Sequence, residues 1–368
     1  MKKFIIIKFI IVYLALFCIS LVHAQLPPAL PVTSLPTTTP QPPAIASPNG
    51  QTTPPAKYAE YQSYCRQNDF DERSVFTDEQ KKRRIDLIEK KIVVNSADTA
   101  AMNALIKEYI AAKDYKRAED VFKKYSENLS AEDQIIWTSE FSVQKKLSAS
   151  AISKLEKFII ENPAANRALI KLAQIKKTLQ FYSEAADIYI DLQNKNKKSD
   201  YSIELCEIYT LDSHHKDAEV NCLQAAKKNP ANHLPEIYLG ISHRERENFK
   251  EAQLNFENSL KKQKSEFALT CLGELHFLKK ERQKTIEYLN QAIELNRASY
   301  RAQLGLALAE FEDKKYDAAL VNFKEACALG QKDTLEMRKS HKILEERKSP
   351  LAKNYYDEIQ KCKAKELF

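Results

Sequence analysis

The stretch YDAALVNFKEACALG, residues 316–330, contains a pattern that recurs along much of this chain. An aromatic residue is followed by Ala319, Phe323 and Ala326, at intervals of three, four and three residues. This spacing places the side chains on one face of an α-helix. Related stretches are YKRAEDVFKKY at 115–125, YSEAADIYIDL at 182–192, HKDAEVNCLQA at 215–225 and FKEAQLNFENS at 249–259. One copy predicts only an amphipathic helix, whereas the repetition predicts a fold.

Seven copies of the pattern align in register on its first alanine. The aligned positions are Ala118, Ala151, Ala185, Ala218, Ala252, Thr285 and Ala319, so successive copies are 33 or 34 residues apart. Thirteen residues earlier, six of the seven copies have a leucine, and the residue after that position is mostly small. A small residue there lets two helices of one copy approach closely.

This pattern resembles the tetratricopeptide repeat, a helix–turn–helix unit of 34 residues, over about residues 99–333. The resemblance implies seven units, at about 99–131, 132–165, 166–198, 199–232, 233–265, 266–299 and 300–333. The second unit departs most, because Thr138, Ser139 and Ser142 stand at signature positions. The expected fold is an all-α, right-handed α-solenoid, with capping helices at 57–98 and 334–368, since each pair must stack on a neighbour to bury its apolar faces.

The start of the chain has the features of a secretory signal peptide. Three lysines precede an apolar run, and small side chains at Val22 and Ala24 predict cleavage after residue 24. The alternative is an uncleaved inner-membrane anchor formed by residues 4–22. Residues 25–56 are rich in Pro and Thr, and we expect a disordered linker there because proline prevents helix and sheet. The expected location is therefore the periplasm.

Six cysteines follow the expected cleavage site: Cys65, Cys206, Cys222, Cys271, Cys327 and Cys362. Most of them replace small or aromatic core residues, so we expect most to act as small buried hydrophobes. Cys206 and Cys222 lie on facing helices of one copy and are the pair best placed for a disulfide, which an oxidising compartment would permit.

Several function classes have no support in the sequence. There is no Gly-rich phosphate loop, no H-E-x-x-H and no G-x-S-x-G. His214 and His215 lack a second ligand pair, and we expect His243 and His276 to pack in consecutive repeats rather than bind metal. The net charge of +7 includes Lys2, Lys3 and Lys8, and lysines alternate with glutamates elsewhere, so nucleic acid is not an expected partner. We therefore expect no enzyme activity, no cofactor, no metal and no small-molecule substrate.

The resemblance also implies where a partner would bind. In tetratricopeptide-repeat proteins the first helix of each unit lines a concave groove that holds peptides or helices, with the second, fifth, ninth, twelfth and thirteenth residues facing it. In units one to four these positions are largely polar: Asn103, Lys107, Asp133, Glu140, Arg167, Gln174, Lys177, Asp200 and Glu207. In units five to seven they are apolar: Leu234, Ile237, Ile241, Phe267, Phe277, Leu278, Leu304, Leu308 and Phe311. The apolar set is the predicted protein-binding site, because exposed apolar patches of this size usually mark one.

The sequence thus predicts an exported, non-enzymatic scaffold that binds a peptide or helix of an envelope protein. The alternatives are a structural protein that self-associates and, with less support, a non-catalytic subunit of an envelope enzyme complex. A further alternative concerns the groove, which the chain could cover itself with residues 355–359 or 70–76.

Overall fold

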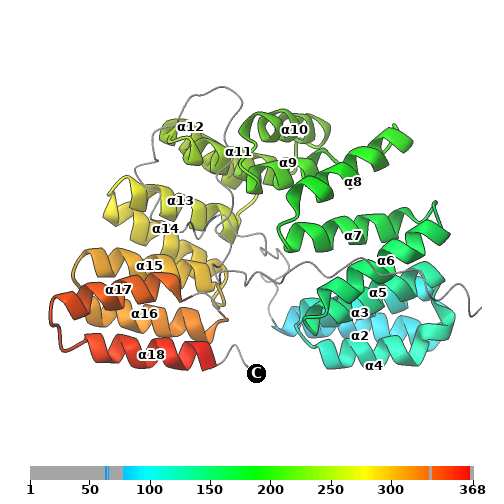
Figure 1. The fold of residues 1–368 in the computed structure, drawn as a ribbon, viewed down its shortest axis with the longest axis horizontal. Coiled ribbons are helices and arrows are strands. Elements are labelled where there is room, and N and C mark those ends of the chain that lie inside the picture. Colours follow the sequence, from blue (N-terminus) through cyan, green and yellow to red (C-terminus); the bar gives the residue numbers. More distant parts are fainter. Residues whose placement is uncertain (1–62, 64, 66–77, 331–333, 365–368) are drawn as a thin grey trace, which may run out of the picture. The chain divides into compact units, whose positions relative to one another are not determined.

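The structure of the chain is a computed structural model, which describes residues 63, 65, 78–330 and 334–364 (Figure 1). All of these belong to the second of two compact units, Lys57–Phe368. The predicted signal peptide and linker lie outside the described residues. No helix of the described residues is long and apolar enough to cross a membrane, and the candidate anchor at 4–22 is not among them.

The described residues contain seventeen α-helices, and successive helices in Figure 1 pack side by side. The helices are α2 (Asp78–Val94), α3 (Thr99–Ala111), α4 (Tyr115–Tyr125), α5 (Ala131–Gln144), α6 (Ser148–Glu161), α7 (Asn166–Thr178), α8 (Tyr182–Lys195), α9 (Ser202–Leu211), α10 (His215–Lys228), α11 (Leu234–Glu245), α12 (Phe249–Lys262), α13 (Glu266–Leu278), α14 (Arg282–Leu295), α15 (Tyr300–Glu312), α16 (Tyr316–Ala328), α17 (Leu335–Glu346) and α18 (Ala352–Ala364). The helices from α3 to α16 form seven pairs, which confirms the expected all-α repeat architecture.

Each pair turns through a residue in the left-handed backbone region. The turn residues are Lys113, Lys146, Gln180, Ser213, Glu247, Lys280 and Lys314, and Lys348 repeats the arrangement between α17 and α18. In the first turn, the N–H of Asp114 donates to the carbonyl of Tyr109 at 2.9 Å, which satisfies a carbonyl at the end of α3. None of these residues is glycine, so every turn adopts a conformation that costs an L-amino acid about 1–2 kcal/mol.

Small residues at the helix contacts explain why the two helices of a pair lie so close. A Cβ added to Gly273 of α13 would lie 2.6 Å from the side chain of Leu289 on α14, and one added to Gly240 would collide with the ring of Phe256. The repeat alanine of α12, Ala252, is fully buried. A larger side chain at these positions would displace the facing side chain or the helix that carries it.

The second unit is helical despite its polar signature positions. In α5, Ser139 donates its hydroxyl to the carbonyl of Ile135 at 2.7 Å, and Ser142 donates to the carbonyl of Thr138 at 2.8 Å. Both serines are buried. Because the helix backbone accepts these hydroxyl protons, the serines are tolerated on a packed face.

The last two helices, α17 and α18, extend the stack as a cap. Tyr355 of α18 is fully buried and donates its hydroxyl to the carbonyl of Tyr316 at 2.8 Å. Its ring contacts Phe323 of α16, with 6.0 Å between the ring centres. A disulfide between Cys327 and Cys362 joins α16 to α18.

Candidate protein-binding surface

The first helices of consecutive pairs contact one another as well as their own second helices. Such contacts join α5 to α7, α9 to α11, α11 to α13 and α13 to α15. We call the surface formed by the predicted ligand-facing positions of these helices the first-helix face. Its polar part consists of the nine polar residues named above, on or beside α3, α5, α7 and α9. Its apolar part consists of the nine apolar residues on α11, α13 and α15.

In the polar part, residues about one repeat apart pair across neighbouring helices. These pairs are Trp137 with Asn103 at 2.6 Å, Arg167 with Asp133, Lys171 with Glu140, and Lys177 with Glu207 at 2.7 Å. Lys107 and Gln174 are exposed, and the side chain of Arg167 is 55% exposed. The polar part therefore presents charged and amide groups to solvent.

Two carboxyl groups of the polar part, those of Asp133 and Glu140, have lowered pKa values. Burial raises the pKa of Asp133, but hydrogen bonds from Arg167 and Ser130 outweigh it, and the pKa is lowered. Burial likewise raises the pKa of Glu140, but the charge of Lys171 together with hydrogen bonds from Lys171 and Gln144 outweighs it, so this pKa is lowered too. Each of these two carboxylates on α5 is thus compensated by a cation on α7, the first helix of the next pair.

The expectation that the apolar part forms an exposed patch was wrong. Seven of its nine residues are buried, namely Ile237, Ile241, Phe267, Phe277, Leu278, Leu304 and Leu308, while Leu234 and Phe311 are half-buried. Every residue of α13 is buried, on all faces of the helix. The C-terminal cap contributes at one end, because Tyr355 of α18 lies against Phe311 with 6.0 Å between ring centres. Whether these residues bind a partner stays a prediction.

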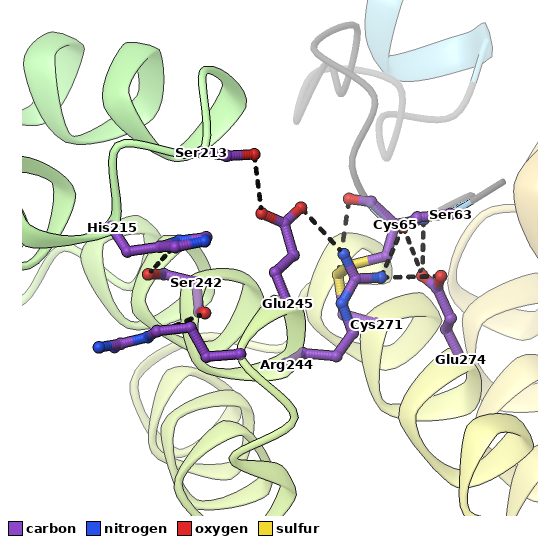
Figure 2. Close-up of polar contacts among 10 residues, drawn as sticks. Ser63, Cys65, Ser213, His215, Ser242, Arg244, Glu245, Cys271 and Glu274 are labelled. Atoms are coloured by element: carbon purple, nitrogen blue, oxygen red, sulfur yellow. Dashed lines mark hydrogen bonds and ion pairs between the residues drawn. A yellow bond between two sulfur atoms is a disulfide. The ribbon is translucent and has the colours of Figure 1, made fainter. Parts of the chain in front are cut away.

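At the other end of the apolar part, Ser63 and Cys65 lie against α11 and α13 (Figure 2). Arg244 Nη1 donates to the Ser63 hydroxyl oxygen at 2.5 Å and forms an ion pair with Glu274 Oε1 at 2.7 Å. Glu274 Oε2 accepts the Ser63 hydroxyl proton at 3.1 Å and the Cys65 N–H at 2.9 Å. The side chain of Glu274 is fully buried and that of Arg244 is 4% exposed. Burial raises the pKa of Glu274, while Arg244, Ser63 and Cys65 act in the opposite direction.

A disulfide fixes this arrangement covalently. Cys65 is bonded to Cys271 of α13, with 5.0 Å between their Cα atoms and 206 residues between them in the chain. The predicted pair Cys206–Cys222 also forms, joining α9 to α10. The expectation that most other cysteines are unpaired hydrophobes was wrong, since all six cysteines after residue 24 are disulfide-bonded. Their even number in a chain with a signal-like start was the signal that could have indicated this.

The two histidines occupy packing positions. His276 is fully buried, stacks on Tyr288 with 5.2 Å between ring centres, and bonds to Glu281 at 2.8 Å. His243 lies 3.2 Å from Arg246, and burial lowers its pKa. Among the described residues, no group of His, Cys, Asp and Glu is placed to hold a metal ion.

Comparison with known proteins identifies the fold. No protein-family model and no curated protein matches the chain in sequence. Yeast Tom70 superposes with a TM-score of 0.54 at 16% identity, and the match covers 74% of this chain and 59% of Tom70. A chain of the APC/C Cut9–Hcn1 hetero-tetramer gives 0.53 at 17%, covering 76% and 56%. A tetratricopeptide repeat protein from Parabacteroides merdae gives 0.48 at 17%, covering 63% and 92%.

Identities this low inform only about fold, and the chain spans less than two thirds of Tom70 and of the Cut9–Hcn1 chain. Both of those proteins are built from tetratricopeptide repeats. Seven helix pairs, left-handed turns at the repeat period and these two superpositions agree with one another. The chain has the fold of a tetratricopeptide-repeat solenoid.

Proposed function

We propose that this chain is an exported scaffold that binds a peptide or helix of an envelope protein on the polar part of its first-helix face. Tetratricopeptide-repeat folds generally serve as non-catalytic scaffolds for protein–protein interaction. The observation that carries the proposal is the contrast within the first-helix face: four of the nine residues of the polar part, Lys107, Arg167, Gln174 and Asp200, are exposed, whereas none of the nine residues of the apolar part is.

Export is supported by the cysteines as well as by the signal-like start. Three disulfides use every cysteine after residue 24. Disulfides persist in the periplasm and other oxidising compartments, while cytosolic thiols are kept reduced. N-terminal sequencing of the exported protein is expected to begin at Gln25; recovery of only the full-length chain, in membranes, would support the anchor instead.

The chemistry of the polar part fits a partner segment with mixed charges. Lysines and carboxylates alternate along it, and most are already paired with one another. A partner carboxylate opposite the exposed Lys107 would pair with that charge, because the desolvation of an unpaired charge is costly. We expect such binding to weaken at high salt, because exposed charge interactions are screened.

The test is a pulldown from envelope extract with three forms of the mature chain: wild type, a first-helix variant and a matched control. The first-helix variant carries Lys107→Glu and Gln174→Arg. The control carries Lys157→Glu and Gln291→Arg on second helices, where both residues are also exposed. A protein retained by wild type and control but lost by the first-helix variant supports the proposal.

Two results would contradict it. One is the same set of proteins on all three forms, which would place binding elsewhere. The other is the absence of any specific partner together with concentration-dependent light scattering, which would favour the structural, self-associating alternative.

A further inference from the structure

The contacts of Ser63 and Cys65 resemble those of a bound peptide. Both residues lie outside regular secondary structure, and their polar contacts come from residues 181 to 211 positions away. They use a backbone N–H and a side-chain hydroxyl, the two kinds of donor that any peptide segment containing serine offers. Figure 2 shows both donors converging on Glu274, while Arg244 donates to the Ser63 hydroxyl oxygen.

Glu274 shows that the site needs an occupant. Its carboxylate is fully buried and forms an ion pair with Arg244 at 2.7 Å. One carboxylate oxygen faces Arg244. The other accepts two hydrogen bonds, one from the Ser63 hydroxyl and one from the Cys65 N–H. Without those two donors, a buried carboxylate oxygen would be left without a hydrogen bond, and its desolvation would not be compensated.

Arg244 is likewise shared with the occupant. Its Nη1 donates to the Ser63 hydroxyl oxygen and pairs with Glu274, and its Nη2 lies 3.4 Å from Glu245 Oε1. Glu245 in turn accepts from Ser213 at 3.4 Å, so the network reaches the turn before α10 (Figure 2). Arg244 is thereby oriented for a hydroxyl oxygen arriving between α11 and α13.

We propose that α11 and α13 form a peptide-binding site for a Ser-x-Cys segment, that its resident ligand is the chain's own Ser63 and Cys65, and that the Cys65–Cys271 disulfide keeps it closed to other peptides. This inference rests on the proposed function, since it explains why only the polar part of the first-helix face is left for a partner.

The disulfide makes the closure durable. Both cysteines are fully buried, and the bond holds the segment at its site at an effective concentration that a free peptide cannot match. In Cys65→Ser the segment remains tethered but is no longer covalently fixed. Cys271 then carries a free thiol beside the Arg244–Glu274 pair.

The experiment uses that thiol to trap a peptide. The probe is YQSYCRQ, the sequence of residues 61–67, supplied as its mixed disulfide with glutathione. The Cys271 thiolate attacks the peptide sulfur, a Cys271–peptide disulfide forms, and glutathione leaves as its thiol, so the electrons balance without another oxidant. Mass spectrometry of non-reduced digests identifies the cysteine that carries the peptide.

We expect Cys65→Ser to capture YQSYCRQ at Cys271 and the wild type to capture none. Capture is expected to be roughly tenfold slower with YQAYCRQ or with the scrambled QCYRSQY, because each loses a hydrogen bond to the charged pair. Cys222→Ser is the matched control: it frees Cys206, another fully buried thiol on a first helix, and is expected to capture no peptide selectively.

Equal capture rates for the three peptides, or equal capture by Cys222→Ser, would overturn the proposal, as would the absence of capture by a folded Cys65→Ser chain. A thermal melt checks folding, and Cys65→Val replaces the serine variant if that one is unfolded. The assay contains no envelope partner, so its failure is distinct from a failure of the pulldown.

Discussion

The polar and apolar parts of the first-helix face are built on the same kind of helix pair, but the buried carboxyl groups in them have pKa shifts in opposite directions. In the polar part, Asp133 and Glu140 have lowered pKa values, because cations on the next helix outweigh burial. On α13, which carries three residues of the apolar part, Glu266 and Glu274 have raised pKa values, because the effect of burial outweighs that of their hydrogen-bond and ion-pair partners. The backbone of the repeat therefore does not determine the chemistry of this face; the residues that cover it do.

The ion pairs beside the two parts also differ in how much they contribute to stability. Pairs such as Arg167–Asp133 lie partly in solvent, where ion pairs contribute little. The Arg244–Glu274 pair is enclosed by Ser63, Cys65 and a disulfide, so the removal of either partner leaves an uncompensated charge. Matched substitutions in and beside the polar and apolar parts test this difference in the contribution of ion pairs to stability.

The largest effect is expected for Arg244→Ala, which leaves the buried Glu274 carboxylate without its cation. We expect a loss of about 3–5 kcal/mol in the free energy of unfolding. Arg167→Ala removes an equally charged partner from the polar part and is expected to cost less than about 1 kcal/mol. Urea denaturation of both variants measures the difference, and equal losses would remove the distinction between the two halves.

A second pair of variants asks whether the helix contacts themselves differ. Ala252 of α12 and Ala118 of α4 are both fully buried at the same repeat position. Replacement of either by leucine is expected to destabilise by roughly 1–3 kcal/mol, since a large side chain overpacks a close helix contact. Similar losses would restrict the contrast to the first-helix face, whereas an unchanged melting temperature at either site would show that the repeat register is wrong.

The pH dependence of stability is expected to have opposite signs in the two halves. Asp133 has a pKa below its ordinary value of 3.8, so its contribution is present above pH 3.8 and is lost as the pH falls. Asp133→Asn should therefore be less stable than wild type at pH 7, by less than about 1 kcal/mol, and the difference should shrink as the pH falls below 3.8.

Glu266 has the opposite behaviour. Burial raises its pKa above the ordinary 4.5, although Ser299 and Thr270 lower it in part, so its contribution is present below pH 4.5 and is lost as the pH rises through the folded-state value. Glu266→Gln should gain stability relative to wild type between pH 4.5 and 7. Melting temperatures of both variants from pH 2 to 8 provide the check; shifts of the same sign would contradict the assigned burial.

The smallest effect is expected at the turns, which are alike in both halves. Lys113 and Lys314 have φ angles of 59° and 64°. Glycine removes the left-handed strain of about 1 kcal/mol but adds freedom to the unfolded chain. We expect Lys113→Gly and Lys314→Gly to stabilise by at most about 0.5–1 kcal/mol, and to do so equally. Thermal melts decide this, and destabilisation by either would contradict the turn geometry.

The repeat period was sufficient to predict the helix pairs. Seven aligned positions, six alanines and Thr285, predicted the close contacts, and the turns observed at Lys113, Ser213 and Lys314 fall where the pattern ended one helix and began the next. Local spacing determines this part of the fold, because each pair packs mainly on its neighbours.

The coverage of the apolar part could not be predicted in the same way. Residues such as Phe277 and Leu308 stand at positions that the resemblance to tetratricopeptide repeats predicts to face a ligand, yet both are buried. Phe277 and Leu308 pack in a cluster with Tyr355 and Ile359 of the C-terminal cap. Cys65, bonded to Cys271, packs in the cluster that contains Ile237, Ile241 and Phe267. No local period encodes such a contact, and six cysteines allow fifteen pairings.

The central claim is that Cys65 is bonded to Cys271 and holds its segment on α11 and α13. Non-reducing peptide mapping of the mature protein, isolated from its own compartment with free thiols blocked, tests this most directly. The account predicts one cross-linked species that joins the Cys65 peptide to the Cys271 peptide, with Cys206 and Cys222 joined separately. A blocked, unpaired thiol at Cys65, or its pairing with any other cysteine, would contradict it.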